Sequence, residues 1–137
     1  MNDIRYETSL QAVDWEALRN DLIADDFHNG RTTGQLRLSF ENSSHCVMAF
    51  CNQRCIGNAR ALSDGVGNAY VIDMWTQSKF RGRGIGQTML KKLLDKLQGQ
   101  HVYLQADDAA GFYKTLGFEP QPEGLFKIVG DYLKSDP

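Results

Sequence analysis

A glycine-rich turn at residues 77–87, with the sequence QSKFRGRGIGQ, contains the residue types that hold a phosphate. Glycines let the backbone approach a ligand closely, so that several N–H groups can point toward one anion. The guanidinium groups of Arg81 and Arg83 can add bidentate contacts. An apolar run precedes the turn and a segment of helical period follows it, and a helix N-terminus adds partial positive charge. The turn is therefore a candidate anion site.

The spacing of the glycines discriminates between three kinds of phosphate site. A dinucleotide fingerprint requires G-x-G-x-x-G, but Gly82, Gly84 and Gly86 run G-x-G-x-G. A P-loop requires Gly-Lys-Ser/Thr, but Gly86 is followed by Gln87. The third kind, the acyl-CoA turn R-x-x-G-x-G, is matched in full by Arg81, Gly84 and Gly86. The structural alternative is a plain strand-to-helix connection with glycines for tight packing.

A second motif follows about one helix and one strand later. Residues 109–118, AAGFYKTLGF, are similar to the signature A-x-x-F-Y-x-x-x-G-F of the GNAT superfamily of N-acetyltransferases. With both motifs, the chain is identified as a member of that superfamily by resemblance. Residues 60–65, 116–120 and 122–124 more narrowly resemble its plastid and cyanobacterial branch. Members of that branch acetylate serotonin-like arylalkylamines and protein lysines.

Hydrophobic periodicity predicts the elements that must position these motifs. Asp14 is expected to cap the first helix, and Gly99 to end the helix that follows the glycine turn. The predicted strands are 3–8, Cys46–Cys51, Arg54–Leu62, Asn68–Thr76, His101–Ala106 and Leu125–Leu133. The predicted helices are Trp15–Ile23, a short one carrying Leu36, Leu38 and Phe40, Thr88–Leu97, and Ala109–Leu116.

This order of elements predicts the fold class. An antiparallel meander, a crossover helix and a parallel strand give an α/β protein with a mixed (α+β), mostly antiparallel sheet and helices on both faces. We expect one N-acetyltransferase domain over residues 1–137. The resemblance implies that the central pair of parallel strands splays apart.

The composition of the chain limits which binding partners and which cellular compartment we expect. The 137 residues carry a net charge of −2 without a basic block, which argues against nucleic acid. No apolar run approaches the roughly 20 residues that span a bilayer, and no secretory signal is recognisable, so a cytoplasmic protein is expected. Cys46, Cys51 and Cys55 are expected to be small buried hydrophobes, and no metal site is expected.

The resemblance implies acetyl-CoA as the co-substrate. Its pantetheine arm would lie between the splayed strands, and its pyrophosphate would take backbone N–H groups of the glycine turn. One departure concerns Ala106, which stands where the family often has an asparagine that contacts CoA. The residues expected to bind acetyl-CoA are Met74, Trp75, Thr76, Arg81, Gly82, Arg83, Gly84, Ile85, Gly86, Gln87 and Phe112.

Two residues are predicted to be catalytic. The family motif places Tyr113 beside the CoA sulfur, where a phenol of pKa about 10 can protonate a thiolate. The alternative for Tyr113 is a core aromatic. Asp73 interrupts an apolar strand and would share a face with Val71 and Trp75, so it is the candidate base, directly or through a water. The alternative for Asp73 is a structural salt bridge. By resemblance, the amide near Trp75 polarises the thioester carbonyl.

The sequence is less informative about the acceptor. Asp21, Asp25 and Asp26 lie where the superfamily covers its acceptor, and they would suit a cationic amine unless they form only a solvated face. Trp15, Phe27 and Trp75 could stack on an aromatic acceptor or simply pack in the core. The expected partners are acetyl-CoA and an amine, without nucleic acid or membrane, and a homodimer is left open. The alternative to an enzyme is a non-catalytic acyl-CoA sensor on the same fold.

Overall fold

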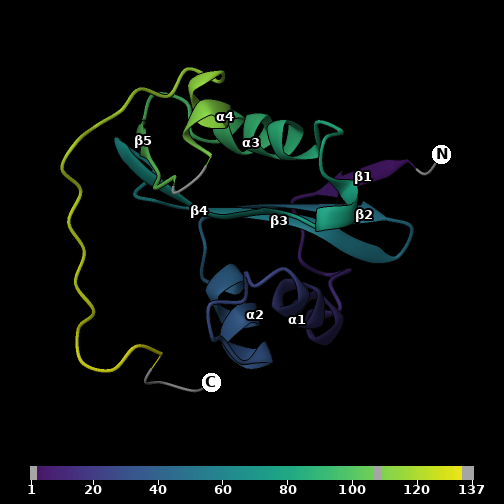
Figure 1. The fold of residues 1–137 in the computed structure, drawn as a ribbon. Helices are drawn as coiled ribbons and strands as arrows, with labels where there is room; N and C mark the ends of the chain where they lie inside the picture. Colours follow the sequence, from purple (N-terminus) through teal and green to yellow (C-terminus); the bar gives the residue numbers. More distant parts are fainter. Residues whose placement is uncertain (1–2, 107–108, 134–137) are drawn as a thin grey trace.

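The computed structural model describes residues 3–106 and 109–133. A five-stranded sheet lies between two helical layers, with α3 and α4 on one face and α1 and α2 on the other (Figure 1). The strands are β1 (Ile4–Glu7), β2 (His45–Cys51), β3 (Arg54–Ser63), β4 (Asn68–Thr76) and β5 (His101–Tyr103). The α-helices are α1 (Trp15–Ala24), α2 (Thr33–Glu41), α3 (Ile85–Asp95) and α4 (Ala110–Lys114), and a 3-10 turn occupies Ser78–Phe80.

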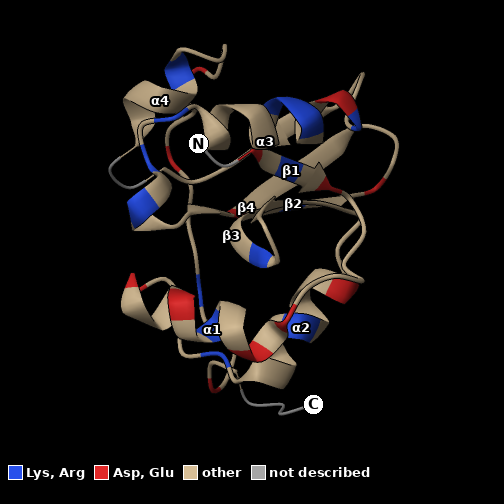
Figure 2. Ribbon diagram, turned by 90° about the vertical axis from the view of Figure 1, so that its right-hand side faces the viewer, with Lys and Arg blue, Asp and Glu red and all other residues tan. Residues whose placement is uncertain are grey.

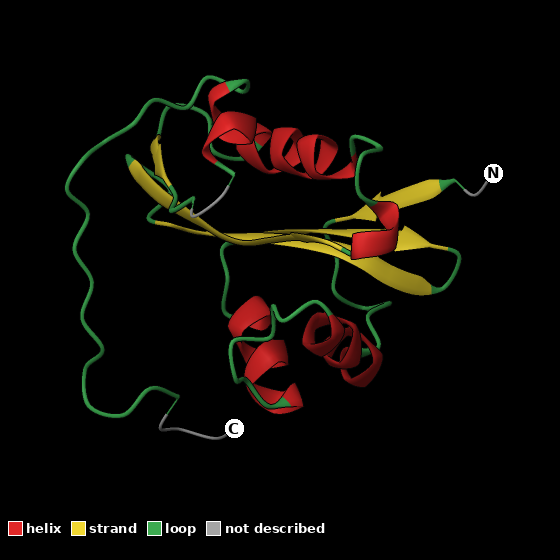
Figure 3. Cartoon of the chain, viewed as in Figure 1, coloured by secondary structure: helices red, strands yellow, loops and turns green. Residues whose placement is uncertain are grey.

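The strands follow their sequence order across the sheet, β1-β2-β3-β4-β5. The first four pair antiparallel, whereas β4 and β5 are parallel and are connected through α3. The mixed sheet with helices on both faces is thus confirmed (Figure 3). No helix in the described ranges is both long and apolar enough to span a membrane.

Hydrogen-bonded caps fix the residues at which α1 and α2 begin. The side chain of Asp14 accepts a hydrogen bond from the Ala17 N–H, as predicted for the start of α1. Thr32 and Gln35 form a capping box in which each side chain accepts from the other residue's backbone N–H. Because such caps satisfy the free amides of a first turn, both helix starts are sharply defined. The loop between the helices, residues 25–32, therefore has a fixed position beside the sheet.

Each face of the sheet has its own core. On one side, α3 buries Met89, Leu90 and Leu93 against alternate residues of β2, β3 and β4, as its helical period predicted. On the other side, Leu18, Leu22, Leu36 and Phe40 of α1 and α2 pack on the opposite residues of the same strands. Most charged residues of the helices are exposed, with Asp21 of α1 as a buried exception, and Figure 2 marks their positions along the ribbon.

The three cysteines are free thiols and are all buried, as the sequence predicted. Burial raises the pKa of the Cys46 thiol to about 11, despite the opposing charge of Arg60. Burial likewise raises the pKa of the Cys55 thiol to about 12. Because the thiolate is the reactive form, Cys46 and Cys55 are poor nucleophiles.

Three predicted elements differ from the structure. Helix α3 begins at Ile85 and not at Thr88, because the left-handed Gly84 (φ 78°) lets the helix start inside the glycine turn. Strand β5 ends at Tyr103, where its pairing with β4 stops. The predicted last strand, Leu125–Leu133, is wrong: this segment pairs with no strand of the described chain, and its residues 130–133 form a bend and a turn.

Candidate active site

A β-bulge in β4 sets the geometry of the site. Asn58 of β3 pairs with Trp75 and Arg60 pairs with Ile72, so β4 carries one extra residue between these pairs. Asp73 accommodates the bulge with a left-handed backbone (φ 59°), and Asn58 Nδ2 donates to the Asp73 carbonyl at 2.8 Å. Such bulges re-aim side chains and are frequent beside active sites.

The bulge also changes which face the side chains of β4 occupy. Val71 packs in the core beneath α3, whereas Trp75 packs in the core of α1 and α2. The prediction that Asp73 shares a face with both is therefore wrong for Val71. Strict alternation would have put all three on one side, but the extra residue breaks that alternation.

Strands β4 and β5 separate just before the bulge. Their pairing covers Asn68–Tyr70 with His101–Tyr103 and no further. From Val71 to Thr76, β4 pairs with β3, and its other edge carries no strand within the described ranges. An unpaired strand edge offers N–H and C=O groups to an extended ligand. This is the splay that the resemblance implied.

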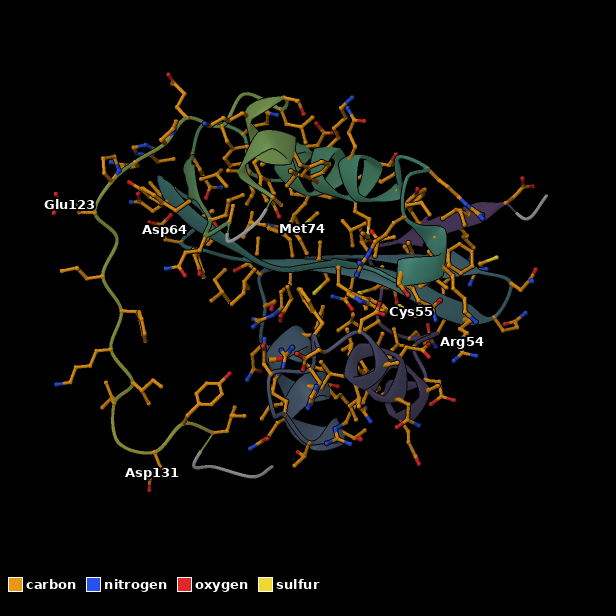
Figure 4. The ribbon with its side chains drawn as sticks, viewed as in Figure 1. Arg54, Cys55, Asp64, Met74, Glu123 and Asp131 are labelled. Carbon is orange, nitrogen blue, oxygen red and sulfur yellow. The ribbon has the colours of Figure 1, made fainter. Side chains whose placement is uncertain are left out.

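A cleft of about 470 Å³ opens at this separation. Its walls come from β4, the glycine turn, the first turn of α3, α4 and the α1–α2 loop. Met74 points from β4 toward the layer of α3 and α4 (Figure 4). The lining residues are Phe27, Met74, Trp75, Thr76, Phe80, Arg81, Gly82, Gly84, Ile85, Gly86, Gln87, Ala109, Phe112 and Tyr113.

The first turn of α3 supplies free backbone donors. Gly84 is its N-cap, and no side chain caps the helix. The first intrahelical bond that the turn closes is Thr88 N–H to the Gly84 carbonyl, at 3.1 Å. The N–H groups of Ile85, Gly86 and Gln87 therefore precede the intrahelical ladder, at the positive end of the helix dipole. These residues fit a diphosphate.

Asp25 ties the α1–α2 loop to the glycine turn. Its Oδ2 accepts from the Trp75 indole N–H at 3.0 Å and from the Ser78 N–H at 3.0 Å, and it lies 3.6 Å from the Arg81 guanidinium. Arg81 also donates from Nε to the Thr76 carbonyl at 3.0 Å. Burial alone would raise the pKa of the Asp25 carboxyl, but these hydrogen bonds outweigh it and leave the pKa below its usual value.

We expect replacement of this anchor to weaken acetyl-CoA binding. In Asp25→Ala, Arg81 and Ser78 lose their shared partner, and the KM for acetyl-CoA should rise about tenfold, the size of one charge-assisted hydrogen bond. Trp75 fluorescence should change as well, because its indole N–H loses its acceptor. The matched control is Asp26→Gly, which removes the neighbouring exposed carboxylate at a left-handed position. An unchanged KM in Asp25→Ala would contradict the anchoring role.

Tyr113 lies on the α4 wall of the cleft. Its ring packs edge-on against Phe112 and Phe118, with centroids 5.1 and 5.9 Å away. Among the described residues, none forms a hydrogen bond with its hydroxyl. Burial raises the pKa of the Tyr113 phenol above its ordinary value, so the group is protonated at neutral pH. The side chain is both half-buried in aromatic packing and available to a ligand.

Asp73 does not line the cleft. Its carboxylate is buried, and it accepts from Arg31 Nη1 at 2.8 Å and from Arg60 Nε at 2.6 Å. Burial alone would raise its pKa, but the two arginines outweigh this effect and lower the pKa of the Asp73 carboxyl. A carboxylate held in this way is a weak base. The structural salt bridge that the sequence left open for Asp73 is thus present, and we propose that it is the main role of this carboxylate.

Three further residues that the sequence suggested for ligand contacts lie outside the cleft lining. Arg83 lies outside the lining, with its guanidinium carbon 5.2 Å from the Phe80 ring centroid. Asp21 is paired with Arg54, not directed to an acceptor. Trp15 packs on Phe40, with centroids 5.7 Å apart. Asp21 and Trp15 are thus engaged within the domain, while the contact of the exposed Arg83 with acetyl-CoA stays a prediction.

Sequence reasoning missed two residues of the lining, Phe80 and Ala109. Phe80 lies inside the predicted turn, but its apolar side chain gave no signal of a binding role. Ala109 is the first residue of the second motif, and its methyl side chain likewise gives no signal of a binding role. Phe27, one of the aromatics predicted for acceptor stacking or core packing, does reach the cleft.

Comparison with known proteins gives a consistent picture. Residues 10–118 match the model of the acetyltransferase (GNAT) family. Over 113 residues the chain is 33% identical to histone acetyltransferase TAP1 of Glycine max, covering 80% of this chain and 44% of that protein. Over 76 residues it is 34% identical to a chloroplastic serotonin N-acetyltransferase 2 of Oryza sativa subsp. japonica, covering 53% of this chain and 38% of that protein.

A solved structure agrees over nearly the full length. A GNAT-family protein from Xanthomonas campestris pv. campestris, described as a putative acetyltransferase, superposes with a TM-score of 0.80 at 24% identity and covers 99% of both chains. This likeness shows the fold, whereas the family match rests on the sequence. The chain spans less than half the length of the two plant proteins. On this evidence, the chain belongs to the acetyltransferase (GNAT) family.

Proposed function

We propose that the protein transfers the acetyl group of acetyl-CoA to a primary amine by direct attack within a ternary complex. One observation carries the proposal: the open edge of β4, the uncapped start of α3 and the Tyr113 hydroxyl all line a single cleft. An extended pantetheine suits the strand edge, a diphosphate suits the helix start and a thioester would then lie near the phenol. These three features together support acetyl-CoA as the donor.

Acetyl transfer requires protonation of the leaving thiolate. Tyr113 is protonated at neutral pH because burial raises its pKa, and it is the proposed acid. The backbone N–H near Trp75 is the proposed donor to the thioester carbonyl, because β4 has an open edge there. The proton, the thiolate and the amide product are then accounted for without a covalent enzyme intermediate.

The amine must enter as the neutral nucleophile. Among the described residues that line the cleft there is no carboxylate and no imidazole. At pH 7 an alkylamine of pKa about 10.4 is neutral at a cost of about 4–5 kcal/mol. The proton is therefore lost to water before or during attack, and the rate should rise with pH in step with the neutral fraction of the amine. The lowered pKa of Asp73 is consistent with this, since Asp73 stays ionised in its salt bridge.

An arylalkylamine is the acceptor class that the cleft favours. Phe27, from the α1–α2 loop, gives the lining an aromatic side chain, and Phe80, Phe112 and Tyr113 add further rings. The Trp75 ring itself is buried in the core of α1 and α2. Asp21 and Asp25 are already paired within the domain, so they are not free to hold the several cationic groups of a polyamine. Aromatic rings recognise flat apolar groups.

A thiol-release assay with matched amines tests the proposal. We expect turnover with a phenylalkylamine to exceed that with an aliphatic amine of equal chain length, and Phe27→Ala should raise the KM of the aromatic amine about tenfold while leaving that of the aliphatic amine unchanged. A lysine peptide in the same panel tests a protein acceptor. Acetyl-CoA binding without turnover of any amine would instead support the acyl-CoA sensor.

A further inference from the structure

The α1–α2 loop carries Phe27 into the cleft on an irregular backbone. Asp26, Asn29 and Gly30 of this loop have left-handed backbone, with φ of 54°, 57° and 74°. Such a conformation is uncommon for residues other than glycine, and it persists only where the surroundings hold it. The position of Phe27 therefore depends on contacts that anchor the loop.

Arg31 anchors one end of the loop to β4. Its side chain is 7% exposed, and it bonds to both carboxylate oxygens of Asp73, from Nη1 to Oδ2 at 2.8 Å and from Nη2 to Oδ1 at 3.2 Å. Its Nε donates to the His28 carbonyl, within the loop, at 3.2 Å. A planar guanidinium fixes such a paired geometry, whereas a lysine ammonium acts as a single point charge. One side chain thus joins the loop to the bulge of β4.

The same residue is also bonded to the two helices that flank the loop. Arg19 Nε of α1 donates to the Arg31 carbonyl at 2.7 Å. Arg31 Nη1 donates to Ser39 Oγ of α2 at 3.2 Å. Arg31 is therefore the point at which α1, α2 and β4 are connected.

Asp25 holds the other end of the loop, because it accepts from the Trp75 indole N–H at 3.0 Å. The two anchors contact β4 on either side of Met74, which lines the cleft. Phe27 lies between Asp25 and Arg31 along the chain. The loop is thus fixed to β4 at two points, with the aromatic side chain of the cleft between them.

Arg60 of β3 provides a comparison within the same cluster. Its side chain is 11% exposed, and its Nε lies 2.6 Å from Asp73 Oδ2. Its other hydrogen bonds go to the Ser39 carbonyl at 3.4 Å and to the Ser43 hydroxyl at 3.3 Å, in and just after α2. The two guanidinium groups share one carboxylate, but the contact with the loop backbone is made by Arg31.

We propose that Arg31 is a positioning residue for the acceptor, because it joins the loop to β4 and so holds Phe27 where the amine binds. Arg31 lies outside the cleft lining, so it acts through Phe27 and not by touching the amine. The Asp25 anchor then serves the donor side of the loop, and the Arg31 anchor serves the acceptor side. The role in acceptor binding rests on the proposed function, whereas the anchoring of the loop does not.

The first test is Arg31→Lys, which keeps the charge beside Asp73 but loses the paired contact and the bond to the His28 carbonyl. We expect the KM of a phenylalkylamine to rise about fivefold, with kcat and the Kd for acetyl-CoA nearly unchanged. Arg60→Lys is the matched control, and its amine KM should stay at the wild-type value. An unchanged KM in Arg31→Lys, or an equal rise in both variants, would overturn the proposal.

A double-mutant cycle tests whether Arg31 acts through Phe27. If it does, Arg31→Lys adds little to Phe27→Ala, and the combined variant should keep the roughly tenfold rise in amine KM of Phe27→Ala alone. Independent effects would multiply to about fiftyfold. That result would contradict the positioning role.

Amide hydrogen exchange tests the anchoring without turnover. The Phe27 N–H donates to the Leu22 carbonyl at 2.8 Å, and its exchange should be at least about tenfold faster in Arg31→Lys than in Arg60→Lys. If circular dichroism shows Arg31→Lys unfolded, Arg19→Met replaces it, because this change releases the Arg31 carbonyl and spares the salt bridge.

Equal exchange in the compared variants would refute the anchoring itself. If the wild type acetylates no amine while the exchange rates still differ, the proposed function fails and the anchoring of the loop by Arg31 is supported. The two failures are therefore distinguishable.

Discussion

Tyr113→Phe should lower kcat by about a hundredfold or more and leave the affinity for acetyl-CoA nearly unchanged. The substitution removes one oxygen atom and preserves the ring contacts with Phe112 and Phe118. The leaving thiolate would then depart without an internal acid. Thiol release gives kcat, and calorimetric titration of acetyl-CoA gives the affinity.

The pH profile separates this role from simple packing. The Tyr113 phenol is an acid only below its pKa, which burial raises above the ordinary value near 10. The fall of wild-type turnover that Tyr113 causes should therefore appear only on the far alkaline side, beyond the rise that follows the neutral amine, and that alkaline limb should vanish in Tyr113→Phe. Tyr103→Phe is the matched control, since Tyr103 is an exposed tyrosine whose hydroxyl contacts His101. Unchanged kcat in Tyr113→Phe would refute the acid assignment.

Removing the Asp73 carboxylate should destabilise the protein by about 3–5 kcal/mol. In Asp73→Ala, the guanidinium groups of Arg31 and Arg60 would remain buried without their shared counter-charge. Thermal or urea unfolding measures the loss. Glu41→Gln is the control, because its partner Arg37 is exposed and such pairs contribute about 0.5 kcal/mol or less.

The Asp73 carboxylate also makes the free energy of unfolding depend on pH in the acidic range. The folded pKa of Asp73 is lowered relative to the unfolded chain, so its contribution is fully present above about pH 4, the unfolded value. It is lost as the pH falls from there toward the folded pKa. Asp73→Asn should flatten this acid dependence of unfolding without shifting the acidic limb of the pH–rate profile. A shifted limb would restore Asp73 as the base.

The sequence predicted elements well where local patterning decides them. The bounds of β4, Asn68–Thr76, agree with the structure, because an apolar run between two turn-forming segments leaves little freedom. The apolar face of α3 and most of the cleft lining followed from helical period and from the two motifs. Both kinds of feature depend on residues that are close together along the chain.

Features that depend on distant partners escaped prediction. The pair Arg31–Asp73 joins residues 42 positions apart, and nothing in either local sequence indicates the contact. The bulge at Asp73 requires a positive φ that aspartate adopts only when its surroundings hold it there. Residues 125–133 have the alternation of a strand, but a strand exists only with a neighbour to pair with.

The bulge has a thermodynamic consequence for the two substrates. Because β4 changes faces halfway along, Val71 and Met74 contribute to the core under α3, while Trp75 contributes to the core under α1 and α2. A displacement of this one strand by acetyl-CoA must repack the layer whose loop carries Phe27, beside the proposed acceptor. Thermodynamic linkage then makes the coupling reciprocal. If bound acetyl-CoA changes the affinity of the protein for the acceptor by some factor, the bound acceptor changes its affinity for acetyl-CoA by the same factor.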